Sequence, residues 1–425
     1  MSITYYVLAA GVAAVITLTL SVVILKISQR YQLYSSSIRD RDVHTSPTPR
    51  LGGVAMFIGI VTAFWVSSQT AQFSLIFADP GRVVAILGAA LIIVLIGVAD
   101  DLWDLDWMTK LAGQMIAAGI LVWQGVQLLT IPIGGVTVVP PVLGLILTVV
   151  AVVLVMNAVN FIDGLDGLVA GVVLIANVVF FIYSFIITDR TYQSEFFNLA
   201  SLISAILIGA CIGFLPVNWH PAKMFMGDSG ALLVGLLMAA SAVSVTGQVD
   251  TGSAISGRQL LPAFIPILLP LAVLVVPLLD FGLAVFRRLR AGKSPFSADR
   301  KHLHHRLLDM GHSHFHAVLI FYAWTAVVAV GFLMFLFVPP WWAVAFIVVG
   351  LFICSWITLA PLTGRKAVEA AVQRASASQT LETHGNRYDP LDAASIDMPD
   401  DEHIPAQNAA EQAVILAALA RKERQ

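Results

Sequence analysis

Eleven apolar stretches, each close to the length of a membrane-spanning helix, occupy most of the first 360 residues. A hydrocarbon core about 30 Å thick needs roughly 20 apolar residues per helix. Charged residues make up only 12% of the chain, about half of the roughly 25% found in soluble domains. Most of the surface therefore does not face water. The pattern predicts an all-α polytopic membrane protein with spans at residues 3–25, 51–68, 83–99, 111–129, 141–158, 168–187, 198–215, 229–246, 260–281, 317–337 and 341–360.

The two ends of the chain differ from each other in character. The first apolar stretch, residues 3–25, has no basic residue before it and no small-residue cleavage signature, so we interpret it as a retained span. Residues 361–425 are polar and rich in Ser, Gln, Asp and Pro, a composition typical of disordered segments. We expect residues 1–360 to form one integral membrane domain and residues 361–425 to form a largely disordered tail.

Basic residues predict the orientation of the chain in the membrane. Eleven spans create two sets of loops, and 21 of the 24 Lys and Arg residues fall in the set that includes the tail. Without the long tail the ratio is still 14 to 3. Short loops rich in Lys and Arg stay on the cytoplasmic side. The sequence therefore predicts an N-terminus outside and a C-terminus in the cytoplasm.

Acidic residues gather in three connections of the same cytoplasmic set. Asp100 and Asp101 end the third span, "NAVNFIDGLDG" follows the fifth, and "NWHPAKMFMGDSG" precedes the eighth. The positive-inside rule does not explain these carboxylates, because acidic residues contribute little to it. Carboxylates at the ends of spans are costly and tend to be functional. We therefore place the candidate site in the cytoplasmic loops.

A cluster of carboxylates favours a hard divalent cation. Carboxylates held close together raise one another's pKa unless a cation lies among them. Oxygen ligands suit Mg²⁺, Mn²⁺ or Ca²⁺, and Mg²⁺ commonly combines one or two carboxylates with substrate phosphates. The same loops contain glycines and the cationic side chains of Lys110, Lys223, Arg300 and Lys301. This combination indicates phosphoryl transfer from a nucleotide diphosphate.

These motifs can also be interpreted as features of helix structure without a functional site. Asp100 and Asp101 are also compatible with a solvated helix end. The spacing of three between Asn157, Asn160, Asp163 and Asp166 does not follow one face of an α-helix. It favours a broken helix end that lines a cavity over a plain turn. Gly167 and Gly171 form a small-xxx-small pair, which we assign to helix packing rather than dimerisation.

The connection before the tenth span contains two groups of three histidines: His302, His304 and His305, and then His312, His314 and His316. By number they are compatible with a Zn²⁺ site, but the run has no Cys or Glu, and its basic neighbours repel a cation. We favour anion contact for the first group and a solvated or interfacial face for the second. Arg50, beside Gly52 and Gly53, is a topology determinant that also suits an anionic lipid headgroup.

Five motifs in order give the chain a family resemblance. They are "HTSPTPRLGG", "DDLWDLDWMTKLAGQ", "NAVNFIDGLDGL", "NWHPAKMFMGDSGALLVG" and "DRKHLHHRL", within residues 40–310. The chain resembles the bacterial polyprenyl-phosphate N-acetylglucosamine-1-phosphate transferases of glycosyltransferase family 4, which are related to phospho-N-acetylmuramoyl-pentapeptide transferase. The resemblance implies transfer of a sugar 1-phosphate from a UDP-sugar to polyprenyl phosphate, with release of UMP, in a bacterial plasma membrane.

The resemblance also implies roles for individual residues. Catalytic residues would be Asp100, Asp101, Asp163 and Asp166, and the Mg²⁺ (or Mn²⁺) ligands would be Asp228, Asp100 and Asp163. Contacts to the nucleotide or sugar phosphate would come from Lys110, Asn157, Asn160, Asn218, Arg300, His302, His304 and His305. Arg50 and Asp101 would contact the prenyl phosphate. Asp100 or Asp101 is a candidate proton acceptor, although a phosphate monoester is mostly dianionic at neutral pH and needs no strong base.

The histidine spacing after Asp299 resembles the hexosamine branch, so we expect UDP-N-acetylglucosamine as the donor. Muramoyl-pentapeptide transfer or another UDP-sugar remains the alternative. A secondary transporter is disfavoured because it would place charges near the midplane, often within internal repeats. An intramembrane aspartyl protease would need two Asp residues inside facing spans, a pattern that the sequence lacks. Expected partners are the two substrates and membrane lipids, without nucleic acid, and a homodimer is left open.

Overall fold

The computed structural model describes residues 2–31, 48–132, 136–191, 195–246, 282, 285–290, 292, 307–308 and 310–359. Long helices dominate this part of the chain, because inside a membrane each backbone N–H must find its partner within its own segment. The longer helices are α1 (Ile3–Tyr31), α2 (Gly52–Ser68), α4 (Gly81–Trp103), α5 (Trp107–Trp123), α6 (Pro141–Phe161), α7 (Leu168–Thr191), α8 (Glu195–Asn218), α9 (Gly227–Thr246), α13 (His314–Met334) and α14 (Pro340–Leu359).

Ten of the eleven expected spans coincide with these helices, and the expected span at 260–281 lies outside the described residues. Within the described part, eight helices are long and apolar enough to cross a membrane. A ninth span is formed if α2 is joined to the segment Ala71–Ala78, which bends away from it by 93°. The protein is therefore a multi-pass, predominantly helical membrane protein. The count of eleven remains a prediction, and the expected tail at 361–425 also lies outside the described residues.

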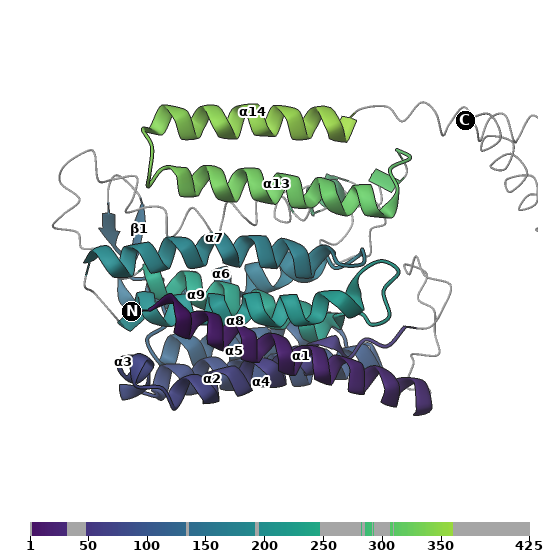
Figure 1. Ribbon diagram of the computed structural model, residues 1–425, viewed down its shortest axis with the longest axis horizontal. Helices are drawn as coiled ribbons and strands as arrows, with labels where there is room; N and C mark the ends of the chain where they lie inside the picture. Colours follow the sequence, from purple (N-terminus) through teal and green to yellow (C-terminus); the bar gives the residue numbers. More distant parts are fainter. Residues whose placement is uncertain are drawn as a thin grey trace, which may run out of the picture. The chain divides into compact units, whose positions relative to one another are not determined.

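Helix α9 lies at the centre of the described bundle. It packs against α6, α4, α8 and α2, and 89% of its most apolar stretch is buried. Helices α13 and α14 pack against each other, and α13 also packs against α7, as Figure 1 shows. Only 11% of the apolar stretch of α14 is buried inside the protein. The apolar surface of α14 is therefore available to lipid, whereas that of α9 is buried against other helices.

Glycines allow the backbones of α2 and α4 to approach α9 closely. A Cβ atom on Gly97 would overlap the backbone of Ser229, and one on Gly53 would overlap the backbone of Gly230. Such contacts are typical of membrane helix pairs, in which small residues bring backbones together. The N-terminal turn of α9 is therefore held against α2 and α4, and this contact positions the loops described below.

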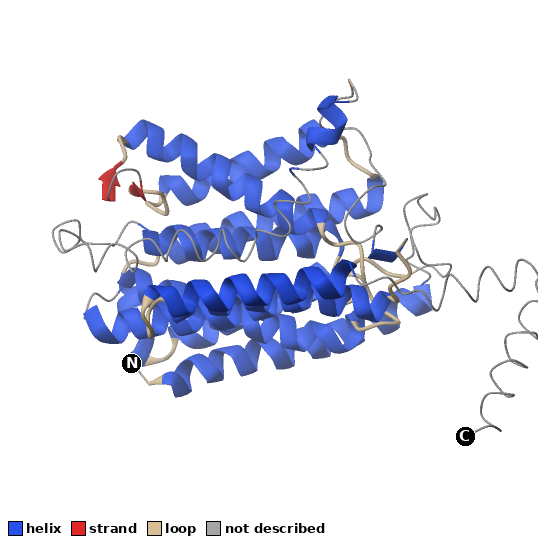
Figure 2. Ribbon diagram, turned by 90° about the horizontal axis from the view of Figure 1, so that it is seen from above, coloured by secondary structure: helices blue, strands red, loops and turns tan. Residues whose placement is uncertain are grey.

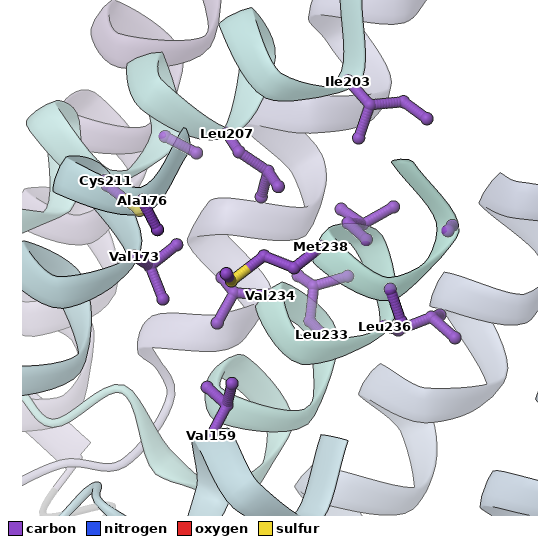
Figure 3. Close-up of a cluster of buried hydrophobic side chains, with 14 of the residues drawn as sticks. Val159, Val173, Ala176, Ile203, Leu207, Cys211, Leu233, Val234, Leu236 and Met238 are labelled. Atoms are coloured by element: carbon purple, nitrogen blue, oxygen red, sulfur yellow. The ribbon is translucent and has the colours of Figure 1, made fainter. Parts of the chain in front are cut away.

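A continuous apolar core joins the central helices. Val159 of α6, Val173 of α7, Leu207 of α8 and Val234 of α9 are all buried within it, and Figure 3 shows them converging from four helices. Cys211 of α8 is also buried in this core, and both Cys211 and Cys354 are free thiols. The absence of a disulfide between them agrees with their positions in apolar runs.

A short hairpin interrupts the connection between α5 and α6. Strand β1 (Thr130–Pro132) pairs antiparallel with β2 (Val136–Val138), with Ile131 opposite Thr137. The hairpin was not expected from the sequence, although it leaves the fold predominantly helical. Figures 1 and 2 place it at the same end of the bundle as the N-terminus. The α4–α5, α6–α7 and α8–α9 connections lie at the opposite end, because each of these helices crosses the bundle once.

Candidate active site

The segment before α2 and the segment before α9 run side by side. Phe225 N donates to Pro49 O at 2.9 Å, Gly52 N to Phe225 O at 3.2 Å, and Gly53 N to Met226 O at 3.0 Å. This short ladder of backbone bonds places Arg50 beside the start of α9. Gly227 has a φ of +71°, and a Cβ atom there would overlap Arg50 O and the Asp101 carboxylate. Only glycine fits both the backbone angle and the space.

The Asp101 carboxylate caps the N-terminus of α9. Its Oδ1 accepts from Asp228 N at 3.2 Å and its Oδ2 from Ser229 N at 3.4 Å. The first N–H groups of a helix have no partner within the helix, and they carry partial positive charge. A negative charge beside a helix N-terminus typically stabilises the helix by about 0.3–1 kcal/mol. Asp101 is only 6% exposed. Its two hydrogen bonds join the end of α4 to the start of α9.

Lys110 lies between two carboxylates. Its Nζ is 3.0 Å from Asp100 Oδ2 and 3.7 Å from Asp228 Oδ2. Asp100 is fully buried and its Oδ1 also accepts from Leu105 N at 2.8 Å. The α4–α5 connection is short, so Lys110 of α5 lies close to Asp100 of α4. Asp104, which follows α4, has a left-handed conformation, and Asp106 is the N-cap of α5. Asp106 N-caps α5 through Met108 N and Thr109 N, so its role here is structural.

Asp163 belongs to the same charged region. Burial and the nearby charges of Asp228 and Asp166 raise the pKa of Asp163 to about 7, while Arg50 acts in the opposite direction. Asp100, Asp101, Asp163 and Asp228 are hereafter called the acidic cluster. When all four are ionised, these carboxylates outnumber their two cationic neighbours, Lys110 and Arg50. The donor atoms are carboxylate oxygens, the type that a hard divalent cation such as Mg²⁺ prefers. Among the described residues, three potential ligand atoms come within 4.8 Å of one another only in the group of Asp166, His220 and His314.

Asp166 points to a different set of partners. Its Oδ2 lies 2.8 Å from His220 Nδ1 and accepts from Ala222 N at 3.1 Å. Its backbone N donates to His314 Nε2 at 3.4 Å. The His220 and His314 rings are stacked, with centroids 4.3 Å apart and planes inclined by 17°. Asp166, His220 and His314 are hereafter called the carboxylate–histidine cluster.

The turn at Gly167 is braced from two sides. Asn218 Oδ1 accepts from Gly167 N at 3.0 Å, and Asn218 Nδ2 donates to Met224 O at 3.0 Å. Tyr322 of α13 donates its hydroxyl to Gly167 O at 2.5 Å, and a Cβ atom on Gly171 would overlap the Tyr322 ring. Gly171 therefore serves helix packing, as the sequence suggested. Asn218 braces the loop, and its contact with a nucleotide remains a prediction.

Asn157 and Asn160 both lie in the last turns of α6, and Asp163 and Asp166 follow in the connection after it. The helix thus ends within the polar motif, as expected from its spacing. Asn157 donates to Gln114 Oε1 at 2.5 Å and to Val153 O at 2.8 Å. The bond between Asn157 and Gln114 joins α6 to α5. Asn160 is half-buried at the helix end, and its role towards a nucleotide remains a prediction.

The histidines divide between described and undescribed residues. Arg300, His302, His304 and His305 lie outside the described residues, so their expected roles remain predictions. The interpretation of the second group as a solvated or interfacial face is wrong for His312, whereas His314 is half-buried and His316 is exposed. His312 is buried and its Nε2 lies 3.2 Å from Thr358 O, and His314 stacks on His220. The spacing of the histidines along the sequence did not indicate that Thr358 and His220 would be their partners.

Residues 83–246 match Glycosyl transferase family 4. The chain is 42% identical over 331 residues to the decaprenyl-phosphate N-acetylglucosaminephosphotransferase of Mycobacterium tuberculosis, covering 77% of this chain and 82% of that protein. It is 31% identical to the probable undecaprenyl-phosphate N-acetylglucosaminyl 1-phosphate transferase of Bacillus subtilis, over 73% of this chain and 80% of that protein. A phospho-N-acetylmuramoyl-pentapeptide-transferase of Halalkalibacterium halodurans is 31% identical over 54% of this chain and 71% of its own.

Proposed function

Because the chain belongs to glycosyl transferase family 4, we propose that it transfers N-acetylglucosamine 1-phosphate from UDP-N-acetylglucosamine to a polyprenyl phosphate. The products are polyprenyl-diphosphate-N-acetylglucosamine and UMP, and the reaction opens a glycan pathway of the cell envelope. The observation that carries the proposal is the 42% identity to a decaprenyl-phosphate N-acetylglucosaminephosphotransferase over 82% of that protein. The muramoyl-pentapeptide relative matches a shorter part of this chain, 54%, at 31% identity.

The reaction is an exchange of one phosphoanhydride for another. An oxygen of the prenyl phosphate attacks the β-phosphorus of the UDP-sugar and forms a new P–O bond. The bond from the β-phosphorus to the bridging oxygen breaks, and UMP leaves with the electron pair. The attacking phosphate is mostly dianionic at neutral pH, so the step requires charge neutralisation and alignment more than a strong base.

The acidic cluster alone would repel both substrates. Two phosphorylated substrates and four carboxylates at one site require cations, and the described residues supply Lys110 and Arg50. We propose that Asp228, Asp100 and Asp163 hold Mg²⁺ or Mn²⁺, which when bound neutralises charge on the diphosphate. Lys110 would hold Asp100 and Asp228 close to each other, because its Nζ lies within 4 Å of both.

The remaining residues position the two substrates. Arg50, held beside the start of α9 by the ladder with residues 225–226, is proposed to contact the prenyl phosphate. Asp101 is committed to two backbone N–H groups of α9, so we propose that it acts by positioning Asp228. Asp166, Asn157, Asn160 and Asn218, with Arg300, His302, His304 and His305, are proposed to face the nucleotide and the sugar phosphate.

The proposed topology lets the two substrates meet. With eleven spans and the N-terminus outside, the acidic cluster faces the cytoplasm, where the soluble UDP-sugar is available. The polyprenyl phosphate reaches the same face from the lipid bilayer. A transporter would carry its charges near the midplane, whereas the described carboxylates of the cluster lie at one end of the helices. Residues 361–425 are proposed to be a cytoplasmic tail, to which no role is assigned.

The proposal is tested with membranes that contain the chain. They are incubated with radiolabelled UDP-N-acetylglucosamine, a polyprenyl phosphate and Mg²⁺, and the lipid extract is separated by chromatography. We expect label in a lipid product that releases N-acetylglucosamine on mild acid treatment, together with one UMP per product, and neither in the presence of EDTA. Parallel reactions use UDP-N-acetylmuramoyl-pentapeptide and other UDP-sugars. The proposal is contradicted if only the pentapeptide donor gives a lipid product, or if none of the donors gives one.

A further inference from the structure

The carboxylate–histidine cluster brings together three ligand atoms from three separate parts of the chain. Asp166 lies in the α6–α7 connection, His220 in the α8–α9 connection, and His314 is the first residue of α13. Their ligand atoms all lie within 4.8 Å of one another. Asp166 is buried, His314 is half-buried and His220 is exposed, so an ion from the solvent has direct access to the group.

The donor atoms differ from those of the acidic cluster. Two imidazole nitrogens and one carboxylate oxygen form the donor set of an open zinc site, in which a fourth position remains for water or another ligand. Imidazole suits Zn²⁺ and similar transition metals, whereas Mg²⁺ prefers oxygen ligands. The two clusters therefore select different ions, although both lie at the same end of the bundle.

The distances permit a shared ion after small movements. Tetrahedral zinc with bonds of about 2.0–2.1 Å requires neighbouring ligand atoms roughly 3.3 Å apart. Asp166 Oδ2 and His220 Nδ1 are 2.8 Å apart, so this pair must open by about half an ångström to meet that spacing. The stacked rings must also turn so that both lone pairs point to one ion, and the χ2 torsion of histidine is broad enough to allow it.

The contacts of Asp166 resemble those that usually support a metal ligand. Its Oδ2 accepts from Ala222 N at 3.1 Å, and hydrogen bonds of this kind hold ligating carboxylates in place. A simple Asp166–His220 hydrogen bond accounts for one histidine. It does not account for a second imidazole from a distant helix, stacked 4.3 Å from the first. Three potential ligands from different elements therefore indicate a metal site rather than a single hydrogen bond between two side chains.

We propose that Asp166, His220 and His314 bind a transition-metal dication of the Zn²⁺ class, and that its binding inhibits the enzyme. The inhibitory part rests on the proposed function, in which Asp166 faces the nucleotide. Coordination engages the Asp166 carboxylate and joins the α6–α7 connection, the α8–α9 connection and α13 through one ion. The loops that must admit and release the nucleotide are then held in one arrangement.

Metal binding is measured first, without substrates, on the purified full chain in detergent. After treatment with EDTA and its removal, Co²⁺ is titrated in excess Mg²⁺, which occupies oxygen-only sites. We expect one equivalent of Co²⁺ to give the intense visible absorption of a four-coordinate ion, and Zn²⁺ to displace it. X-ray absorption of the zinc-loaded wild-type chain should show a nitrogen and oxygen shell with two imidazoles. An all-oxygen shell, or one with three imidazoles, overturns the proposal.

Variants identify the ligands. His220→Gln and His314→Gln should each weaken Co²⁺ binding at least tenfold, while His316→Gln, in the same helical turn as His314, serves as the matched control and should retain it. A triple variant at His302, His304 and His305 tests the other histidine group. Absorption that persists in both single variants and disappears in the triple variant overturns the proposal. Thermal unfolding of each variant shows whether it is folded, and the wild-type absorption data stand independently of the variants.

Inhibition is measured separately by transfer assays in excess Mg²⁺. We expect micromolar Zn²⁺ to suppress wild-type transfer, and the half-inhibitory concentration to rise at least tenfold in whichever of the two histidine variants retains measurable transfer. Site-specific Zn²⁺ binding without loss of wild-type transfer overturns the inhibitory part. If no UDP-sugar gives a lipid product, the proposed function fails instead, and the substrate-free binding data still decide whether the site exists.

Discussion

At the scale of single residues, neighbouring carboxylates have different partners. Asp100 pairs with Lys110, whereas Asp101 accepts two backbone N–H groups at the start of α9. Asp163 is affected by the charge of Asp228, while Asp166 bonds His220. The two members of each pair, Asp100 with Asp101 and Asp163 with Asp166, therefore lie in different environments.

Replacement of Asp228 by Asn tests the proposed metal ligand. The side chain keeps its size but loses the charge that balances a divalent cation, so we expect transfer to fall at least 100-fold, in the range typical for loss of one preorganised electrostatic contact (about 10²–10³). Lipid-linked product formed per minute is the measurement. Asp79→Asn, at an exposed position where α4 begins at the opposite end, is the control and should retain transfer. An active Asp228→Asn enzyme would refute the ligand assignment.

The raised pKa of Asp163 predicts how metal binding depends on pH. Because its pKa is about 7, Asp163 is largely protonated below pH 7 and must release a proton when a cation binds. Affinity should therefore fall as pH decreases below 7, approaching tenfold per unit, and should level off above it. Electron paramagnetic resonance of Mn²⁺ between about pH 5.5 and 8.5 measures this without substrate. Asp163→Asn should flatten the dependence, and a flat wild-type profile would contradict the prediction.

At the scale of elements, the site depends on how closely α4 approaches α9. The Asp101 cap and the Lys110 bridge both require the end of α4 to lie beside the first turn of α9. Gly97 makes this possible because its missing Cβ leaves room for the Ser229 backbone. Helix packing and site geometry are therefore coupled at this contact.

Gly97→Ala should separate the two helices. The added methyl group overlaps backbone rather than a movable side chain, so we expect a loss of about 1–3 kcal/mol of stability and weaker transfer through displacement of Asp228. Gly88→Ala is a matched control in the same helix, since a Cβ atom there meets nothing within 4 Å. It should be neutral or stabilise the helix by up to about 1 kcal/mol. Thermal unfolding in detergent compares the two, and equal midpoints would argue against the close contact.

At the scale of the whole molecule, the proposed orientation places the acidic cluster in the cytoplasm. Gln69 and Met108 are both exposed, and they lie at opposite ends of the described bundle. Single cysteines at these positions, in a chain without Cys211 and Cys354, therefore report the two faces. In intact cells an impermeant maleimide should label Gln69→Cys but not Met108→Cys, which should react only after the membrane is opened. The reverse pattern would overturn the orientation.

The sequence by itself determined the membrane-spanning character, the position of most helices and the set of loops that hold the candidate site residues. These follow from hydropathy, charge and glycine content over short windows, which are local properties. It also located the break after α6, because the spacing of Asn157, Asn160 and Asp163 is incompatible with one helix face. The small hairpin β1–β2 escaped prediction, since pairing of such short strands depends on their surroundings.

Only the tertiary structure decided which residues meet. Asp166 lies beside His220, 54 positions away, and beside His314, 148 positions away, and no periodicity in the sequence relates these residues. Their contact depends on how α7, α8, α9 and α13 pack, which small residues such as Gly171 permit. The same packing gives Asp100 and Asp101 different partners, because the direction of each side chain from α4 determines whether it faces Lys110 or the first turn of α9.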